Sequence, residues 1–319
     1  MKVAITGGAG GVGSSVAFNL LLATHPYEIL LSDNRPSMVT SHTMDFEQVL
    51  EQGATGSVRA AVPAELADAD LIVAGGAAAL TVNTSRMVYL ADNAAVLEEL
   101  LGRLPGGWPG ILIIVTNPVD PLCTWALGRA GLARERLLGY TLNDSLRLRT
   151  AIAGELGVAP GRVEAWVVGE HGDGSVALFD RVRVDGEPVA LDAAARERAL
   201  EFLHGWYTRH VALDSGRSST WTSGLGAARM IEAIRADSGE LWPASVVLAG
   251  EYGIDGAALG VPVRLGRGGV AELPEWELGP EEEAALRAGA DTVRAAAAEI
   301  GPPTRDRQRE RRRDGTEGT

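Results

Sequence analysis

The chain has 319 residues, of which 46% are hydrophobic and 22% charged, as is usual for a globular protein with a sizeable core. Its formal net charge of −13 argues against a nucleic-acid partner and against an anionic membrane surface. The single cysteine, Cys123, excludes an intramolecular disulfide and is compatible with a reducing compartment. Since neither an N-terminal signal nor an apolar stretch of roughly 18 residues is found, we expect a soluble, cytoplasmic protein.

The first half of the chain alternates short apolar runs with stretches long enough for helices. A helix is expected at Ser14–Ala23. The apolar runs, each typical of a buried parallel strand, are Val3–Thr6, Glu28–Asp33, Leu71–Ala74 and Ile111–Val115. The alternation predicts an α/β fold with a doubly wound parallel sheet of the Rossmann type, which binds ligands at the carboxyl ends of its strands. We expect this dinucleotide-binding domain to span residues 1–142.

A glycine-rich turn joins the first predicted strand to the first predicted helix. Gly8, Gly10 and Gly13 have the G-x-G-x-x-G spacing of a dinucleotide-binding turn, and Val12 belongs to the same stretch. Gly8 would allow the tight turn, Gly10 the approach of a pyrophosphate, and Gly13 the close packing of helix and strand. Asp33 follows Gly13 by 20 residues, at the end of the second predicted strand. A carboxylate there accepts the ribose hydroxyls of NAD and repels the 2′-phosphate of NADP.

NAD is therefore the predicted cofactor, with two alternatives left open. Asp33 could be an ordinary turn residue. Arg35, two residues further on, could soften the preference for NAD over NADP.

After about residue 145 the pattern becomes that of an α+β substrate-binding domain, which we expect to span residues 143–301. Antiparallel strands are expected at Val246–Leu248 and Val261–Leu265. The other predicted elements are strands at Val163–Val168 and Val176–Val184 and helices at about Asp192–His210, Thr222–Ala236 and Pro280–Ile300. The remaining residues, 302–319, combine prolines with a dense run of charges, which predicts a disordered tail.

The best candidate for catalysis is His171, in the stretch Gly-Glu-His-Gly-Asp. Histidine titrates in the range that proton transfer to a carbonyl oxygen requires, and Gly169 and Gly172 would leave room for a ligand beside its ring. In the stretch Asp-Ser-Leu-Arg, Asp144 and Arg147 are three residues apart and share one helix face. The aspartate could orient the imidazole, and the guanidinium could grip a substrate carboxylate with two hydrogen bonds. The alternatives are a structural histidine and an ordinary intrahelical salt bridge.

These motifs resemble those of the lactate/malate dehydrogenase family, and the resemblance covers nearly all of the chain from Lys2 to about Ile300. It implies an NAD-dependent enzyme that moves a hydride between the nicotinamide and C2 of a small 2-hydroxy or 2-oxo acid, with L stereochemistry and without a metal. It also implies a homodimer or homotetramer. The motifs that carry it, in chain order, are Gly8–Gly13 with Asp33, Val115–Asp120, Asp144–Arg147, Gly169–Asp173 and Gly250–Gly253.

The resemblance also implies roles for single residues. His171 would be the proton donor and acceptor, paired with Asp144, and Arg147 would bind the substrate carboxylate. Asn117, in the stretch Thr-Asn-Pro, would contact both the nicotinamide side of the cofactor and the substrate.

One loop departs from the family pattern. Arg86, followed after seven residues by Asn93, matches the end of a mobile loop whose arginine polarises the substrate carbonyl, and Asn93 would contact the cofactor. Malate dehydrogenases carry another arginine about six residues earlier, where this chain has alanines and Leu80. A buried second carboxylate would lack a partner there, so we expect a substrate with an uncharged side chain. Alternatively, Arg217 reads that carboxylate. Ser219 is expected to line the pocket.

Two further hypotheses belong to other functional classes. An NAD-dependent glycosidase on a related fold would need a metal site of cysteine and histidine, and Cys123 is not part of such a cluster in the sequence. A non-catalytic NADH-binding regulator would not need His171, Asp144 and Arg147 together.

Overall fold

The computed structural model describes residues 1–77 and 89–300. Arg86, the residues Ala78–Leu80 that bear on substrate choice, and the predicted tail at 302–319 lie outside the described residues.

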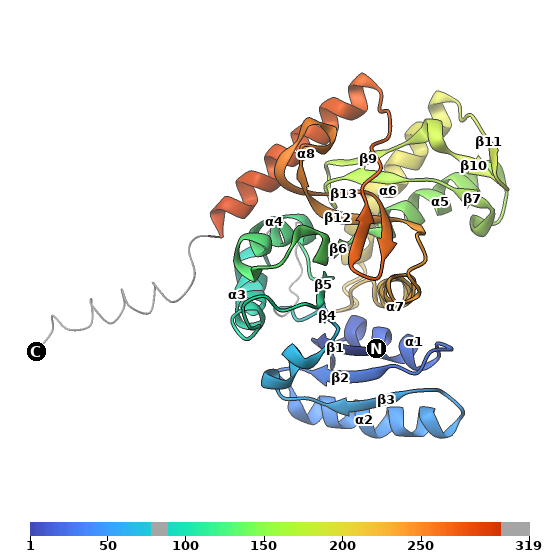
Figure 1. Cartoon of the computed structure of the whole chain (residues 1–319). Helices are drawn as coiled ribbons and strands as arrows, with labels where there is room; N and C mark the ends of the chain where they lie inside the picture. Colours follow the sequence, from blue (N-terminus) through green and yellow to red (C-terminus); the bar gives the residue numbers. More distant parts are fainter. Residues whose placement is uncertain (78–88, 301–319) are drawn as a thin grey trace, which may run out of the picture.

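Six parallel strands form the N-terminal part of the main sheet, in the order β3-β2-β1-β4-β5-β6 (Figure 1). Their bounds are β1 Lys2–Thr6, β2 Glu28–Ser32, β3 Ser57–Ala60, β4 Leu71–Ala74, β5 Ile111–Ile114 and β6 Leu137–Tyr140. This confirms the Rossmann-type sheet. The strand order reverses between β1 and β4, which is where such sheets place their ligands. The sequence analysis missed β3, which is largely exposed and carries Arg59, and β6, where Gly139 interrupts the apolar pattern.

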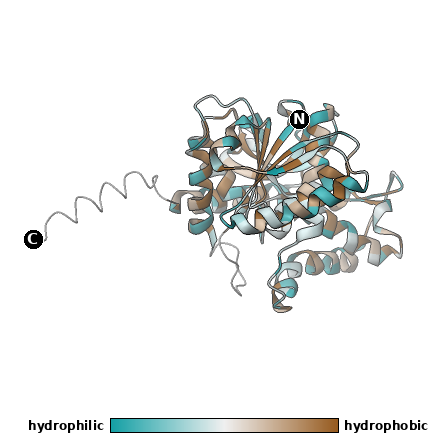
Figure 2. Cartoon of the chain, turned by 90° about the horizontal axis from the view of Figure 1, so that it is seen from below, coloured by the Kyte–Doolittle hydropathy of each residue, from teal (hydrophilic) through white to brown (hydrophobic). Residues whose placement is uncertain are grey.

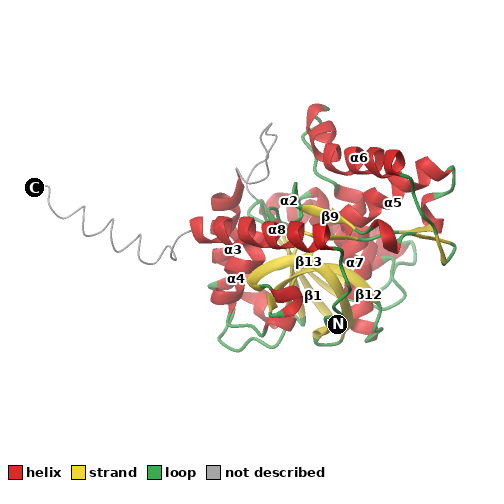
Figure 3. Ribbon diagram, turned by 90° about the horizontal axis from the view of Figure 1, so that it is seen from above, coloured by secondary structure: helices red, strands yellow, loops and turns green. Residues whose placement is uncertain are grey.

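The helices lie on both faces of this sheet, as Figure 3 shows for the whole molecule. Their bounds are α1 Gly11–Leu21, α2 Pro36–Glu51, α3 Leu90–Leu101, α4 Val119–Ala130, α5 Leu142–Leu156, α6 Ala193–Ala212, α7 Thr220–Ala236 and α8 Pro280–Glu299. Helix α1 begins at Gly11, three residues before the predicted start at Ser14, since Ser14 already donates its backbone N–H to Gly10. The amino end of α1 therefore lies directly at the glycine-rich turn.

The central strands are apolar on both faces, and successive residues enter different core layers. In β4, Leu71 and Val73 belong to the layer under α1 and α7, whereas Ile72 and Ala74 belong to the layer under α3 and α4. Figure 2 shows the resulting apolar centre of the sheet. Burial on both faces explains why these runs are continuously apolar rather than alternating.

Antiparallel strands extend the same sheet beyond β6. They are β12 Leu241–Ala249, β13 Asp255–Gly266, β8 Val167–Gly169 and β9 Ser175–Ala177, with β14 Gly269–Glu272 paired to β13. Strand β12 pairs with β6, Ala244 lying opposite Tyr140. The described parts of the two regions therefore share one continuous sheet of eleven strands.

Two predicted strands were wrong in extent. The run Val163–Val168 is divided between β7 (Val163–Glu164) and β8, which belong to different sheets. The run Val176–Val184 contains β9, a 3-10 turn at Phe179–Arg181, and then β10 (Arg183–Val184), which pairs with β7 and with β11 (Glu187–Pro188). The chain bends at these points because Ala165, Phe179 and Val182 are buried in a third core cluster, between α5 and α6.

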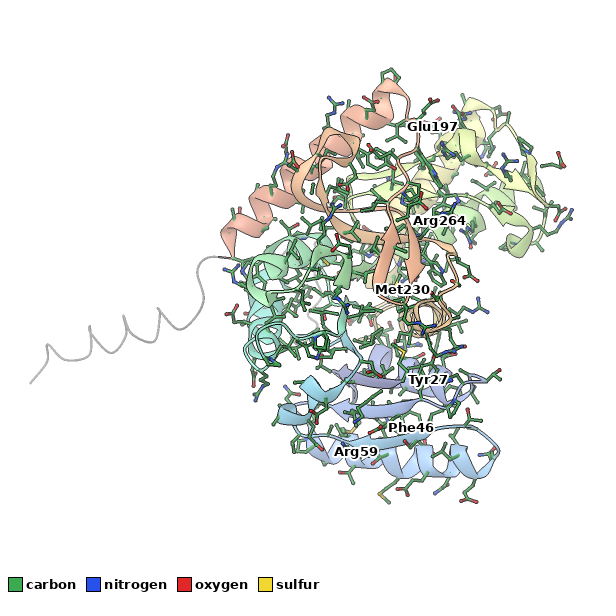
Figure 4. All side chains as sticks on the ribbon, viewed as in Figure 1. Tyr27, Phe46, Arg59, Glu197, Met230 and Arg264 are labelled. Atoms are coloured by element: carbon green, nitrogen blue, oxygen red, sulfur yellow. The ribbon has the colours of Figure 1, made fainter. Side chains whose placement is uncertain are left out.

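Helix α7 joins the two regions by packing against α1. A Cβ atom at Gly224 would lie 2.0 Å from Ser15 Oγ, so a larger residue would push the helices apart. Figure 4 labels Met230 of α7 and Tyr27 near this junction, and both belong to the same core layer. Of the helices in the described part of the chain, none combines the length and apolar character needed to cross a membrane.

Candidate active site

A cavity of about 260 Å³ lies beyond the carboxyl ends of β4, β5 and β6, where Gly75, Asn117 and Asn143 line it. Helix α6 and the segment between α6 and α7 line it as well. Seven of the described residues singled out from the sequence contribute to its wall: Val12, Asn93, Asn117, Arg147, His171, Arg217 and Ser219. The structure thus gathers residues that are up to 207 positions apart in the chain.

His171, Asp144 and Arg147 form one buried cluster, which we call the acid–base cluster. Asp144 and Arg147 lie one turn apart on α5, and His171 follows β8. One carboxylate oxygen of Asp144, Oδ2, contacts His171 Nδ1, and the other, Oδ1, accepts a hydrogen bond of 2.9 Å from Arg147 Nη1. The side chains are only 5% exposed for His171 and 10% for each of the other two. The predicted aspartate partner is therefore in contact, and Arg147 is not merely part of an exposed helix salt bridge.

A second carboxylate, overlooked in the sequence, holds the backbone of the histidine. Asp120 Oδ2, on the first turn of α4, accepts a hydrogen bond of 2.5 Å from the backbone N–H of His171. Burial raises the pKa of Asp120 to about 7, and the nearby carboxylates of Glu170 and Asp144 act in the same direction. The sequence offered one signal, since Asp120 closes the quoted stretch Val115–Asp120.

The glycines beside His171 shape the loop that follows β8. Gly169 has φ 91°, a conformation that side chains disfavour. A Cβ atom at Gly172 would lie 2.3 Å from Glu170 Oε1, so this position makes room for Glu170. The carboxylate of Glu170 in turn accepts a hydrogen bond of 2.7 Å from the backbone N–H of Gly174. Both glycines therefore have a part in the conformation of this loop.

Asn117 brings a polar group to the cavity wall from the turn after β5. Its backbone carbonyl accepts a hydrogen bond of 2.6 Å from Asn93 Nδ2, which links the start of α3 to this turn. Among the described residues, nothing donates to its side-chain oxygen Oδ1, which is buried. A buried acceptor of this kind is costly unless a donor reaches it, and the carboxamide N–H₂ of a nicotinamide is a donor of suitable type.

The glycine-rich turn after β1 is more tightly built than its spacing suggests. Gly7, with φ 65°, takes the left-handed conformation at the turn, so the tight turn predicted for Gly8 depends on Gly7 instead. A Cβ atom at Gly13 would lie 2.3 Å from the carbonyl oxygen of Gly7, so α1 packs directly on the turn. Gly10 donates its backbone N–H to the same carbonyl oxygen at 2.9 Å. The turn thus places the amino end of α1 at the carboxyl ends of the parallel strands, as an anion site requires.

Asp33 lies beside this turn at the end of β2. Its Oδ2 accepts a hydrogen bond of 3.1 Å from the backbone N–H of Ala9, and its Oδ1 accepts one of 3.0 Å from Arg35 Nε. The side chain is 5% exposed for Asp33 and 52% for Arg35. The carboxylate is therefore fixed at the glycine-rich turn, and Arg35 partly neutralises it. Asp33 Oδ1 also accepts a hydrogen bond of 3.1 Å from the backbone N–H of Arg35, as the aspartate of a turn commonly does.

Much of the opposite wall was missed in the sequence. Trp206, Tyr207, His210 and Val211 line the cavity from the last turns of α6, and Asp214–Ser218 continue the wall toward α7. The Arg217 guanidinium lies over the Trp221 ring, 5.4 Å from its centroid. From the sequence, the stretch of α6 was predicted only as a helix at about Asp192–His210, without a role in the site.

In the described ranges, no group of three or more histidine, cysteine or acidic side chains is arranged to hold a metal ion. The chemistry that the described side chains can supply is proton transfer and the binding of an anion, beside a turn suited to a dinucleotide.

Comparison with known proteins agrees with this arrangement. Residues 1–139 match the model of the lactate/malate dehydrogenase NAD-binding domain, and residues 141–300 match that of the α/β C-terminal domain of the same family. The chain belongs to the lactate/malate dehydrogenase family. It is therefore an NAD-dependent oxidoreductase that acts on the CH–OH group of a 2-hydroxy acid.

The relatives of this chain include proteins named malate dehydrogenase and proteins named L-lactate dehydrogenase. The chain is 32% identical to a malate dehydrogenase of Halobacterium salinarum, over 94% of this chain and 99% of the relative. It is 31% identical to L-lactate dehydrogenase 1 of Bifidobacterium longum, over 92% and 96% respectively. The solved malate dehydrogenase of Aeropyrum pernix superimposes with a TM-score of 0.86 at 25% identity, covering 95% of this chain and 99% of that one.

Proposed function

We propose that this dehydrogenase reduces a 2-oxo acid with an uncharged side chain, using His171 as the proton donor and Arg147 as the ligand of the substrate carboxylate. The observation that carries the proposal is the acid–base cluster, in which Asp144 contacts both of these residues at a buried cavity wall.

The proton transfer is assigned to His171. Because Asp144 engages Nδ1, the other ring nitrogen, Nε2, is the one that would exchange a proton with the substrate oxygen. The carboxylate fixes the ring and stabilises the imidazolium that supplies the proton. Bound NADH supplies the hydride for C2 of the 2-oxo acid.

Binding of the substrate carboxylate is assigned to Arg147. Its guanidinium is held by Asp144 at one nitrogen, Nη1, and the side chain lines the cavity. The planar fork matches a carboxylate in a way that an ammonium group does not, so this contact would also orient C2 relative to His171.

The cofactor is assigned to the residues around the glycine-rich turn. Gly8, Gly10 and Gly13 would bring the turn against the pyrophosphate, and Asp33 would accept the ribose hydroxyls. Val12, Asn93 and Asn117 line the cavity on the side where the nicotinamide would lie. The carbonyl-polarising role of Arg86 rests on the family resemblance alone.

An uncharged substrate side chain is favoured by the cavity wall. Trp206 and Val211 present aromatic and aliphatic surface there, and Arg217 directs its guanidinium over Trp221. A second carboxylate placed against an apolar surface would lose its hydration without gaining a cation. The competing function is a malate dehydrogenase in which Arg217, which also lines the cavity, reads that carboxylate.

The test is the reduction of pyruvate, 2-oxobutyrate, a longer branched 2-oxo acid and oxaloacetate, followed at the NADH absorbance band. We expect oxaloacetate to have the lowest kcat/KM, and Leu80→Arg to raise its kcat/KM relative to pyruvate by about tenfold or more. Ala78→Arg and Ala79→Arg are tested beside it, so that the new arginine is placed at each of the three positions that could correspond to the malate dehydrogenase arginine. A wild-type preference for oxaloacetate that Arg217→Ala abolishes would establish the competing function instead.

We also infer that the chain forms a homo-oligomer. Large apolar side chains are exposed on α2 and α7, namely Met38 (41%), Met44 (60%), Trp221 (69%) and Leu225 (40%). Apolar groups of this size gather at interfaces between subunits. Light scattering coupled to size-exclusion chromatography should give a dimer or tetramer mass, and a monomer at micromolar concentration would contradict the inference. The single cysteine supports a reducing compartment, the cytoplasm, for this activity.

A further inference from the structure

The guanidinium of Arg147 is held on its face as well as on its edge. Its Cζ atom lies 3.9 Å from the centroid of the Trp206 ring, which is close contact between a cation and an aromatic face. Asp144 accepts the hydrogen bond from Nη1 at the edge of the same group, 2.9 Å away. One face and one edge of the fork are thus defined by two side chains from different helices, α6 and α5.

Trp206 reaches this position because α6 packs along α5, as the two helices in Figure 3 show. Ala199 and Leu203 are buried on the α5 side of α6, and Trp206 continues this stripe one turn later. His210, a further turn along, stacks on the indole with 4.9 Å between ring centroids and 12° between the planes. His210 donates a hydrogen bond from Nε2 to the carbonyl oxygen of Arg217 at 2.8 Å, so the stack is tied to the segment before α7.

We propose that Trp206 is the positioning residue for Arg147, which sets the orientation of the guanidinium before the substrate arrives. The indole acts through Arg147 and therefore affects the recognition of every 2-oxo acid, whatever its side chain. This inference rests on the proposed role of Arg147 in binding the substrate carboxylate.

The expected effect of removing the indole on substrate affinity follows from the kind of contact that is lost. An arginine side chain that loses its aromatic support gains rotamer freedom, which the substrate must then remove on binding. A partly desolvated cation–π contact corresponds to about tenfold in affinity. The chemical step, which depends on His171 and Asp144, should change little.

The experiment compares Trp206→Leu with Trp206→Phe, using glyoxylate as substrate because it has a hydrogen in place of a side chain. We expect the leucine variant to raise the KM for glyoxylate by about tenfold while kcat and the Kd for NADH stay within about twofold. The phenylalanine variant, which keeps an aromatic face, should return to within about threefold of the wild-type KM. If the leucine variant does not fold, Trp206→Met replaces it, with the same expectations.

Two further variants separate positioning from other roles. In an Arg147→Gln background, which has no cation, adding Trp206→Leu should change KM by less than about twofold. Trp276→Leu is the matched control, since Arg181 lies over that ring at 4.2 Å and neither residue lines the cavity. It should leave the KM for glyoxylate unchanged.

The outcomes distinguish the inference from the proposed function. A Trp206→Leu variant with wild-type KM for glyoxylate but a changed KM for larger 2-oxo acids would overturn the inference, because Trp206 would then be only a wall for the side chain. The inference would also be overturned if Trp206→Leu raised the KM for glyoxylate as much in the Arg147→Gln background as in the wild type. If the wild-type protein reduces no 2-oxo acid, the proposed function fails first.

Discussion

The glycine-rich turn and the acid–base cluster hold their polar groups by different kinds of contact. At the turn, backbone atoms determine the geometry: Gly7, Gly10 and Gly13 approach one another closely, and Asp33 is fixed by the backbone N–H of Ala9. In the cluster, side chains determine it. Asp144 contacts His171, which is 27 residues away in the chain, and Asp120 holds the backbone of His171 from 51 residues away.

This difference predicts how each region responds to substitution. At the turn, a changed side chain such as that of Asp33 should alter the affinity for one cofactor over another and leave turnover intact. In the cluster, Asp144 contacts both of the other side chains, so its substitution should affect proton transfer and substrate binding at once.

The largest effect is expected for His171→Ala, which removes the proton donor from the cluster. Turnover should fall by about a hundredfold or more, because the developing alkoxide would have no positioned acid. The Kd for NADH, measured by fluorescence titration, should stay near the wild-type value because the turn is untouched. A variant that retains near-wild-type turnover would show that another group donates the proton.

Asp144→Asn should have the next largest effect and should change two parameters together. The neutral amide cannot stabilise the imidazolium, so kcat should fall by roughly tenfold to a hundredfold. Arg147 would also lose its charged partner, and the KM for the 2-oxo acid should rise. Steady-state kinetics separates the two effects. A change in kcat with KM unaltered would mean that the shared carboxylate does not couple the two residues.

A smaller effect, confined to cofactor choice, is expected at the turn. We expect the wild-type enzyme to favour NAD(H) over NADP(H) by at least about tenfold in kcat/KM, or about 1.4 kcal/mol, and Asp33→Ser to narrow this ratio. Arg35→Ala, which removes the neutralising partner of Asp33, should widen it. Equal use of both cofactors by the wild-type enzyme would contradict the assignment of Asp33.

The smallest effect concerns stability and its pH dependence. Because the folded protein raises the pKa of Asp120 from 3.8 to about 7, it binds this proton more tightly than the unfolded chain does. The associated stability is complete below about pH 4 and is lost as the pH rises through about 7. In Asp120→Asn, which cannot titrate, urea midpoints at about pH 4.5 and about pH 8 should differ less than in the wild type. If the two urea midpoints of Asp120→Asn differed as much as those of the wild type, Asp120 would not be the source of the pH dependence of stability.

The contrast also explains how much the sequence could predict. The parallel strands, the spacing of Gly8, Gly10 and Gly13, and Asp33 are local signals, and the structure bears out the Rossmann-type sheet that they predict. The pairing of Asp144 and Arg147 follows from helix periodicity and is likewise observed.

The contacts that span the chain were not predictable in the same way. Nothing local in the sequence of α6 indicates that Trp206 lies on Arg147, because that contact depends on how α6 packs against α5. Asp120 supports His171 because the fold places the first turn of α4 beside the segment that follows β8. The division of the run Val163–Val168 between two sheets also depends on burial from both sides, which local periodicity does not encode.

The central claim, hydride transfer between the nicotinamide and C2 of a 2-oxo acid, is tested most directly by isotope transfer. The wild-type enzyme is supplied with pyruvate and with NADH that carries deuterium at both C4 positions, and the product is analysed by mass spectrometry and NMR. We predict lactate with one deuterium on C2, none on the methyl group, and one equivalent of NADH oxidised per product. His171→Ala should give the same labelling at a much lower rate. Oxidation of NADH without deuterium at C2, or no product from any 2-oxo acid, would contradict the claim.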